Sequence, residues 1–206
     1  MKLFKPFCTV LIILVVVSCN KKETKIAVFQ PNDQNGKDTA ISESNPSANY
    51  STLDRIHMVS LSSNDSVKND VRSLLRFGFA TLKEEISIDS AFVHLYAIDP
   101  GHFGSNNSFV LIPVKKVWIN DEVTWNNQPE VDTNKTITVE APTNANQDYK
   151  INITDYVRAV HQNKQPNYGF MIQLEDEKNA YKGLRFHSSN SKDVSKHPKL
   201  EVFYTE

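Results

Sequence analysis

The residues of this chain best suited to chemistry are basic and aromatic. Strand alternation places Arg72 and Arg76 on one face of a β-rich run, close enough for both to bind carboxylates of one polymer through paired hydrogen bonds. The alternative is that each arginine pairs with an acidic side chain of a neighbouring strand. Trp118, Tyr181 and Arg185 complete the candidate set, because an aromatic ring offers a ligand a flat apolar face.

Structural roles compete with binding for the last three residues. Trp118 is interpreted either as a packing residue or as an exposed platform, whereas Trp125 is expected to fix a turn. Tyr181 and Arg185 fall in a segment that is equally consistent with a solvated hairpin. We therefore treat five residues as candidates for ligand binding and not as an established site: Arg72, Arg76, Trp118, Tyr181 and Arg185.

Catalytic patterns are absent from the sequence. It contains no G-x-S-x-G elbow, no P-loop and no G-x-G-x-x-G turn. Acidic neighbours such as Glu84 and Glu85, or Glu175 and Glu177, are expected by chance among 24 acidic residues. The sequence therefore predicts a protein that is not an enzyme and that needs no cofactor.

One stretch has oxygen ligands at alternating positions. Asp33, Asn35 and Asp38 surround Gly36, as in a loose Ca²⁺ loop, but the bidentate glutamate of an EF-hand is missing. The competing interpretation is an ordinary surface turn. Structural zinc is excluded because the folded part of the chain contains no cysteine.

The N-terminus has the layout of a secretory signal. Lys2 and Lys5 precede an apolar run at residues 7–17, which is shorter than the roughly 20 residues that span a bilayer. The run ends in V-V-S-C, which resembles a bacterial lipobox, so Cys19 is expected to carry the acyl chains. We predict a lipoprotein signal peptide at 1–18, a lipidated tether at 19–25 and a folded domain at 26–206, held at the outer membrane in the cell envelope.

Composition limits the classes of partner. Removing Lys2 and Lys5 leaves 23 − 2 = 21 basic residues against 24 acidic ones, a formal charge of about −3. This balance argues against nucleic acid. The length fits one domain with one core, whose stability comes from apolar burial since no disulfide is available.

Short β-rich runs separated by Asn, Asp, Ser, Gly and Pro dominate the folded domain. They lie at 26–29, 56–61, 71–79, 88–98, 109–117, 136–139, 168–174, 184–187 and 200–204. Both faces of 88–98 are largely apolar, which indicates a central strand, and His94 and Tyr96 are expected beside the arginine strand if the two runs pair. Residues 152–163 predict one short helix that covers an open end, with Thr154 as its N-cap.

These elements predict an all-β fold, a jelly-roll-like β-sandwich of two antiparallel sheets with one short helix. Four blocks add a resemblance. They are GKDTAIS at 36–42 with Asn45-Pro46 and Asn49-Tyr50, RSLLRF at 72–77, Trp118 with VTWNNQP at 123–129, and NYGF at 167–170 with PKLEVFY at 198–204.

In this order the blocks resemble the DNRLRE-domain family of bacterial secreted modules, although the hexapeptide that names the family is absent. The resemblance implies a sandwich without catalytic machinery, and some relatives are classed as carbohydrate-binding modules. We expect a lipid-anchored protein that binds polysaccharide, most naturally an acidic one given its arginines. The alternative is a structural or adhesive envelope lipoprotein that docks a protein partner.

Overall fold

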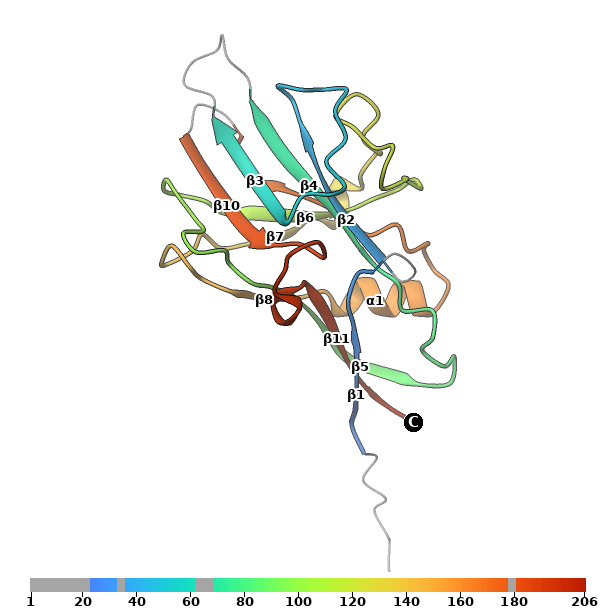
Figure 1. Ribbon diagram of the computed structural model, residues 1–206. Coiled ribbons are helices and arrows are strands. Elements are labelled where there is room, and N and C mark those ends of the chain that lie inside the picture. The colour runs from blue at the N-terminus through green and yellow to red at the C-terminus, as the bar shows by residue number, and fades with distance from the viewer. Residues whose placement is uncertain (1–22, 33–35, 62–68, 178–180) are drawn as a thin grey trace, which may run out of the picture.

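The computed structural model describes residues 23–32, 36–61, 69–177 and 181–206. Two antiparallel sheets form a sandwich (Figure 1). The four-stranded sheet has the order β1 (Lys25–Phe29), β11 (Lys199–Thr205), β5 (Ser87–Leu95), β8 (Tyr149–Asn152). The seven-stranded sheet has the order β10 (Tyr181–His187), β3 (Arg55–Leu61), β4 (Asp70–Phe77), β9 (Phe170–Leu174), β6 (Phe109–Pro113), β7 (Ile137–Val139), and β2 (Gly36–Ser42) also pairs with β4.

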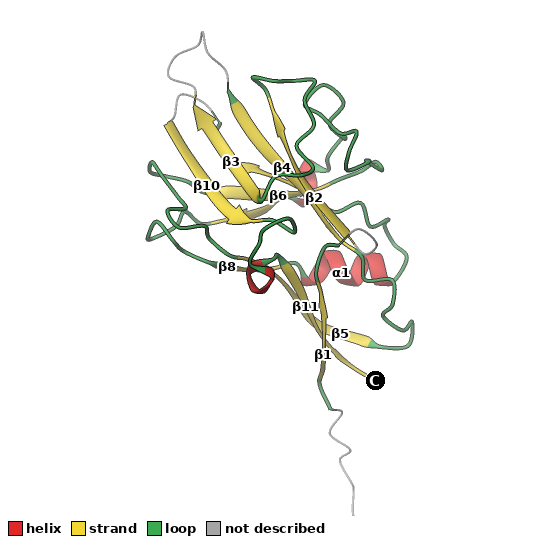
Figure 2. Cartoon of the chain, in the orientation of Figure 1, coloured by secondary structure: helices red, strands yellow, loops and turns green. Residues whose placement is uncertain are grey.

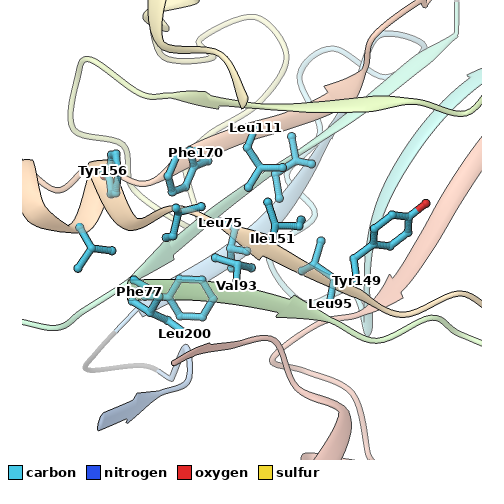
Figure 3. Close-up of a cluster of buried hydrophobic side chains, with 14 of the residues drawn as sticks. Leu75, Phe77, Val93, Leu95, Leu111, Tyr149, Ile151, Tyr156, Phe170 and Leu200 are labelled. Carbon is cyan, nitrogen blue, oxygen red and sulfur yellow. The ribbon is translucent and has the colours of Figure 1, made fainter. Parts of the chain in front are cut away.

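The main core fills the space between the two sheets. Alternate residues of each strand point inward, as strand geometry requires. Figure 3 shows Leu75 and Phe170 of the larger sheet close to Val93 and Ile151 of the smaller one, with Tyr156 at one end of the cluster. This interleaving of large apolar side chains supplies the burial that the chain needs in place of a disulfide.

A second, smaller core lies on the opposite face of the larger sheet. It consists of Ile41, Leu74, Val114, Trp118, Val123 and Met171. The segment after β6, which carries Trp118, folds over β2, β4 and β9 to bury these side chains. The face that carries Arg72 and Arg76 is therefore partly covered.

The one α-helix of the described residues, α1 (Thr154–His161), appears red in Figure 2 with the 3₁₀ turns η1 (Thr133–Lys135) and η2 (Val194–Lys196). Tyr156 and Val157 of α1 are buried in the main core, and the Tyr156 ring lies 4.3 Å from that of Phe170 on β9. The helix thus packs against both sheets, because it follows β8 directly and reaches β9. Of the described helices, none is long and apolar enough to cross a membrane.

The expected N-cap at Thr154 is wrong. The helix begins at Thr154, the cap position is Ile153, and the Asn152 side chain accepts a hydrogen bond from the Thr154 backbone N–H at 2.9 Å. The Thr154 hydroxyl is used elsewhere, since it accepts a hydrogen bond from the backbone N–H of Ala91 at 2.9 Å. It ties the start of the helix to β5.

The predicted sandwich of two antiparallel sheets with one short helix is confirmed. One predicted neighbour relationship is wrong: β5 pairs with β11 and β8, so His94 lies on the sheet opposite the arginine strand β4. Tyr96 follows the end of β5, where its carbonyl accepts a hydrogen bond from His187 of β10. β5 is central in its sheet, but Phe92 and His94 are partly exposed, so only one of its faces is buried in the core.

Candidate functional site

A row of basic side chains crosses the outer face of the four-stranded sheet. Lys199 of β11 and Lys150 of β8 both pair with His94 of β5, from opposite sides. Directly paired residues of adjacent strands point to the same face, about 5 Å apart. The three side chains therefore form a continuous line of nitrogen groups across three strands.

A second row, two residues along each strand, is aromatic and polar. Phe92 of β5 pairs with Glu201 of β11 and Asn152 of β8, and Phe203 lies two residues beyond Glu201. The Phe92 and Phe203 rings meet edge to face, with centroids 6.1 Å apart. The Lys150 ammonium lies 4.5 Å from the Phe92 centroid, within the range of cation–π attraction. We call the set Phe92, His94, Tyr96, Lys150, Lys199, Glu201 and Phe203 the aromatic-lysine face.

Glu201 is the one carboxylate of this face, and basic groups surround it. Its oxygens lie 2.9 Å from Lys199 Nζ, 2.7 Å from His94 Nε2 and 3.7 Å from Lys150 Nζ. The hydrogen bond from Lys199 is the main cause that lowers the pKa of Glu201, and the same contact raises the pKa of Lys199. Two lysines and one carboxylate leave the face with a net positive charge at neutral pH.

Burial favours the neutral form of His94. Burial lowers its pKa from the ordinary value of 6.5, and the attraction of Glu201 only partly offsets that effect. Its ring stacks on Tyr96, with centroids 6.4 Å apart and planes inclined by 21°. Lys196 lies 5.1 Å from the Tyr96 centroid and extends the aromatic and basic surface toward η2. The face therefore combines exposed ring area, hydrogen-bonding groups and positive charge.

Arg72 already has a full set of partners. Its Nε and Nη2 donate to the two oxygens of Glu177 at 3.0 and 2.7 Å, its Nη1 donates to Gln128, and the guanidinium lies 4.6 Å from the Trp125 ring centroid. This is the alternative raised from the sequence, in which the arginine pairs with a neighbouring acid. Arg72 therefore fixes the segment after β9 to the outside of the larger sheet.

Arg76 lies four residues further along β4, with the buried Leu74 between the two arginines. At about 3.3 Å per residue, the Cα atoms of the two arginines are roughly 13 Å apart, so they do not act as a close pair. Trp118 is only 4% exposed and donates its Nε1–H to the Tyr168 carbonyl at 2.8 Å. Its indole is a packing group of the second core and presents no platform to a ligand.

Tyr181 and Arg185 both lie on the edge strand β10 and contact the same ring, that of Phe103. The Phe103 ring lies 5.3 Å from that of Tyr181, which is 74% exposed, and 4.9 Å from the Arg185 guanidinium. This group is separated from β4 by β3. The five residues named from the sequence thus do not converge on one site.

The Ca²⁺ candidate is only partly described. Asp33 and Asn35 lie outside the described residues, while Asp38 lies within β2, 2% exposed, and accepts a hydrogen bond from the Ser189 backbone N–H at 3.0 Å. Burial raises the pKa of Asp38. Among the described residues no group of three or more His, Cys, Asp or Glu side chains is arranged to hold a metal ion.

A groove of about 680 Å³ follows α1 on one side. It is lined by acidic and basic side chains in equal number, Asp89 and Asp155 against Lys135 and Arg158. Its aromatic residue, Tyr156, is only 7% exposed and already packs in the core. The groove therefore lacks both the ring surface and the charge excess of the aromatic-lysine face.

Comparison with known proteins decides the family. A family model for carbohydrate-binding module family 96 matches residues 31–204, which covers both sheets except β1. The chain belongs to this family. The family 96 assignment makes the domain a non-catalytic carbohydrate-binding module and agrees with the kind of family expected from the four sequence blocks. No curated protein matches the chain.

In this family 96 module, the aromatic-lysine face is a candidate binding surface that the sequence alone does not predict. Its signal was present: Phe92, His94 and Tyr96 alternate with small and aliphatic residues, and Lys199, Glu201 and Phe203 alternate with Leu200 and Val202. That alternation indicates a strand with one exposed face. In the sequence alone this face of 88–98 resembles an apolar one, because two of its three central members, Phe92 and Tyr96, are aromatic.

Proposed function

We propose that the chain is a lipid-anchored cell-surface protein whose module binds acidic polysaccharide on the aromatic-lysine face. Membership of a carbohydrate-binding family supports the class of ligand. The observation that carries the choice of an acidic polymer is the row Lys199, His94 and Lys150 beside the partly exposed Phe92 and Phe203 rings. Aromatic rings contact the apolar faces of the sugar rings, and the lysines attract their carboxylates.

The direct test is electrophoresis of the purified domain through gels that contain alginate, polygalacturonate or a neutral glucan. We expect the two acidic polymers to retard the protein and the glucan to leave its mobility unchanged. Retardation should weaken as salt is added, because exposed charges are screened over about 10 Å at 0.1 M ionic strength. Retardation by the neutral glucan alone would contradict the acidic specificity.

The site is tested with the double variant Lys150→Gln/Lys199→Gln, which removes two charges from the face and leaves Glu201 uncompensated. Its matched control is Lys164→Gln/Lys192→Gln, which removes two exposed lysines outside the face and gives the same net charge. We expect the first variant to lose most of its retardation and the second to lose little. Equal loss in both would mean that net charge alone, and not this face, governs retention.

Lipid anchoring is a separate part of the proposal and rests on the sequence around Cys19, which lies outside the described residues. Cells that express the full chain should incorporate labelled palmitate into it, and Cys19→Ser should abolish the label. Exposure to added protease on intact cells would then distinguish a surface-facing module from one that faces the periplasm. A full-length chain that never takes up palmitate contradicts the anchor without affecting the binding site.

Docking of an envelope protein is the alternative function, and one observation favours it. Ile26 and Val28 of the edge strand β1 are 58% and 55% exposed and lie on the same face as Phe203. Mild crosslinking on cells, followed by purification of the chain, would reveal a stable partner. Loss of that partner in Ile26→Ser/Val28→Ser, with no polymer retarding the domain, would favour docking over sugar binding.

A further inference from the structure

Two positive side chains oppose each other on the outer face of the larger sheet. In the β2–β4 pair Lys37 lies directly opposite Arg76, so both side chains point to the same face. Like charges in this position destabilise a sheet unless something compensates them. Both residues are partly buried, which increases the cost of leaving their charges without a counterion.

Among the described residues no carboxylate lies within ion-pair distance of this pair. In that part of the chain neither Lys37 nor Arg76 forms an ion pair, and the Arg76 guanidinium makes no hydrogen bond. Asp121 attracts Lys37 from a greater distance. The contrast with Arg72 on the same strand is clear, because Glu177 binds that guanidinium through two oxygens.

The Lys37 ammonium is held in place by Trp118. It lies 4.2 Å from the Trp118 ring centroid and donates a hydrogen bond to the Trp118 carbonyl. Burial, followed by the repulsion of Arg76, lowers the pKa of Lys37 to about 8. A bound anion would raise the pKa of Lys37 again, since it would give the partly desolvated ammonium a counterion and offset the repulsion of Arg76.

The backbone under Arg76 is equally constrained. Gly169 has φ of +80°, and a Cβ at this position would lie 2.8 Å from the Arg76 Cβ and 2.3 Å from the Leu75 carbonyl oxygen. The Tyr156 hydroxyl, which accepts the Gly169 backbone N–H at 3.0 Å, supports this turn from the helix side. The strand register therefore places two cationic residues side by side, on a backbone that has little room to move.

We propose that Lys37 and Arg76 form a second anion site, which takes one carboxylate of a uronic acid residue. The guanidinium would bind the carboxylate through paired hydrogen bonds and the ammonium would add a third contact. The nature of the ligand rests on the proposed function, but the site does not rest on the aromatic-lysine face, which belongs to the other sheet. A module with anion sites on both sheets can bind two polymer chains and hold them together.

The test is an NMR titration of the isotopically labelled domain with sodium galacturonate, read at the side-chain signals of Lys37 and Arg76. We expect both signals to shift with a common, saturable dependence on concentration. We also expect the pKa of Lys37 to rise when galacturonate is bound. Arg76→Gln should weaken the response of Lys37 at least tenfold, as expected for the loss of the charge-assisted hydrogen bonds from the guanidinium. In the absence of ligand it should raise the pKa of Lys37, because a repelling neighbour is removed.

Arg55→Gln is the matched control, since Arg55 is a strand arginine whose side chain is 42% exposed and pairs with Asp54. It should leave the response of Lys37 unchanged. Sodium sulfate, titrated separately, distinguishes a site for carboxylates from one for sulfate esters. A response to sulfate and none to galacturonate would overturn the uronate assignment, and no response to either would overturn the site.

The outcomes also separate this proposal from the previous one. If Lys150→Gln/Lys199→Gln abolishes retardation while galacturonate never shifts Lys37, the second site fails and the proposed function stands. If galacturonate shifts Lys37 in that variant as well, the second site stands by itself. Crosslinking of two chains is measured by light scattering of long polygalacturonate, which should rise with the wild-type domain and not with Arg76→Gln.

Discussion

Phe92 and Phe203 meet edge to face on the outside of the four-stranded sheet, with their planes inclined at 83°. They come from strands that are adjacent in space and more than one hundred residues apart in sequence. The geometry fixes one ring against the other while leaving part of each exposed. A pair of this kind supplies a rigid apolar surface at low entropic cost.

Phe92→Ala should reduce retardation by polygalacturonate several-fold without a large loss of stability, because the ring is on the surface and outside the main core. Retardation in gels and the midpoint of urea unfolding measure the two effects separately. Tyr181→Ala is the control, as it removes an exposed aromatic ring from the other sheet. A larger effect of Tyr181→Ala than of Phe92→Ala would move the site to β10.

Arg72 and Glu177 should be energetically coupled. Their side chains are 22% and 13% exposed and share two hydrogen bonds, so a double-mutant cycle with Arg72→Ala and Glu177→Ala should give about 1–3 kcal/mol of coupling. Urea unfolding measures it. Retardation by acidic polymers should change little in Arg72→Ala, and a strong loss of retardation at full stability would restore Arg72 as a ligand residue.

Trp118→Ala should destabilise the domain by about 3–5 kcal/mol, because it empties the centre of the second core. Trp118→Phe keeps most of the apolar contact and loses the hydrogen bond to Tyr168, which is worth about 1 kcal/mol. Chemical unfolding ranks the two variants. A Trp118→Ala domain that unfolds like the wild type but no longer binds polymer would show that the indole is a sugar platform after all.

Stability should fall as the pH is lowered from 6.5 to about 4, and His57 is one cause. Burial, together with Arg55 and Arg185, lowers the pKa of His57 from 6.5 to about 4. Above pH 6.5 both the folded and the unfolded forms are neutral at this position. Below it the unfolded chain takes up the proton first, which favours unfolding by up to about 3 kcal/mol.

The measurement is urea unfolding at a series of pH values. His57→Gln should lose this part of the acid dependence, whereas the same change at His161, on α1, should retain it. An unchanged acid dependence in His57→Gln would contradict the assigned pKa.

Most of the fold could be predicted because strand alternation is a local property. Phe109 and Ile172 lie in apolar runs that are bounded by turn residues, and both are fully buried in the sandwich. The sequence does not predict strand β2, because Asp38 and Thr39 are buried polar residues and Asp38 is satisfied by Ser189 from a distant segment. No local pattern reports such partners.

The candidate site could be predicted much less well. Arg72 and Arg76 have the same residue type and the same face, yet one is bound by Glu177 and the other faces Lys37. Whether an arginine meets an acidic or a basic partner depends on which strands become neighbours, and the sequence pattern does not predict the order of the strands. Sheet order likewise brings Phe203 to Phe92, and strand pairing at such separation is set by the packing of the whole core.

Lys25, the first residue of β1, lies beside the end of β11, because β1 pairs antiparallel with β11 and Lys25 forms an ion pair with Glu206. A force that pulls at Lys25 along the direction of β1 acts in shear on this strand pair. It loads the five residue pairs between β1 and β11 together and does not peel them apart one by one. If the proposed anchor holds the protein while a polymer pulls on the module, tension along β1 would thus be resisted by all of these pairs at once.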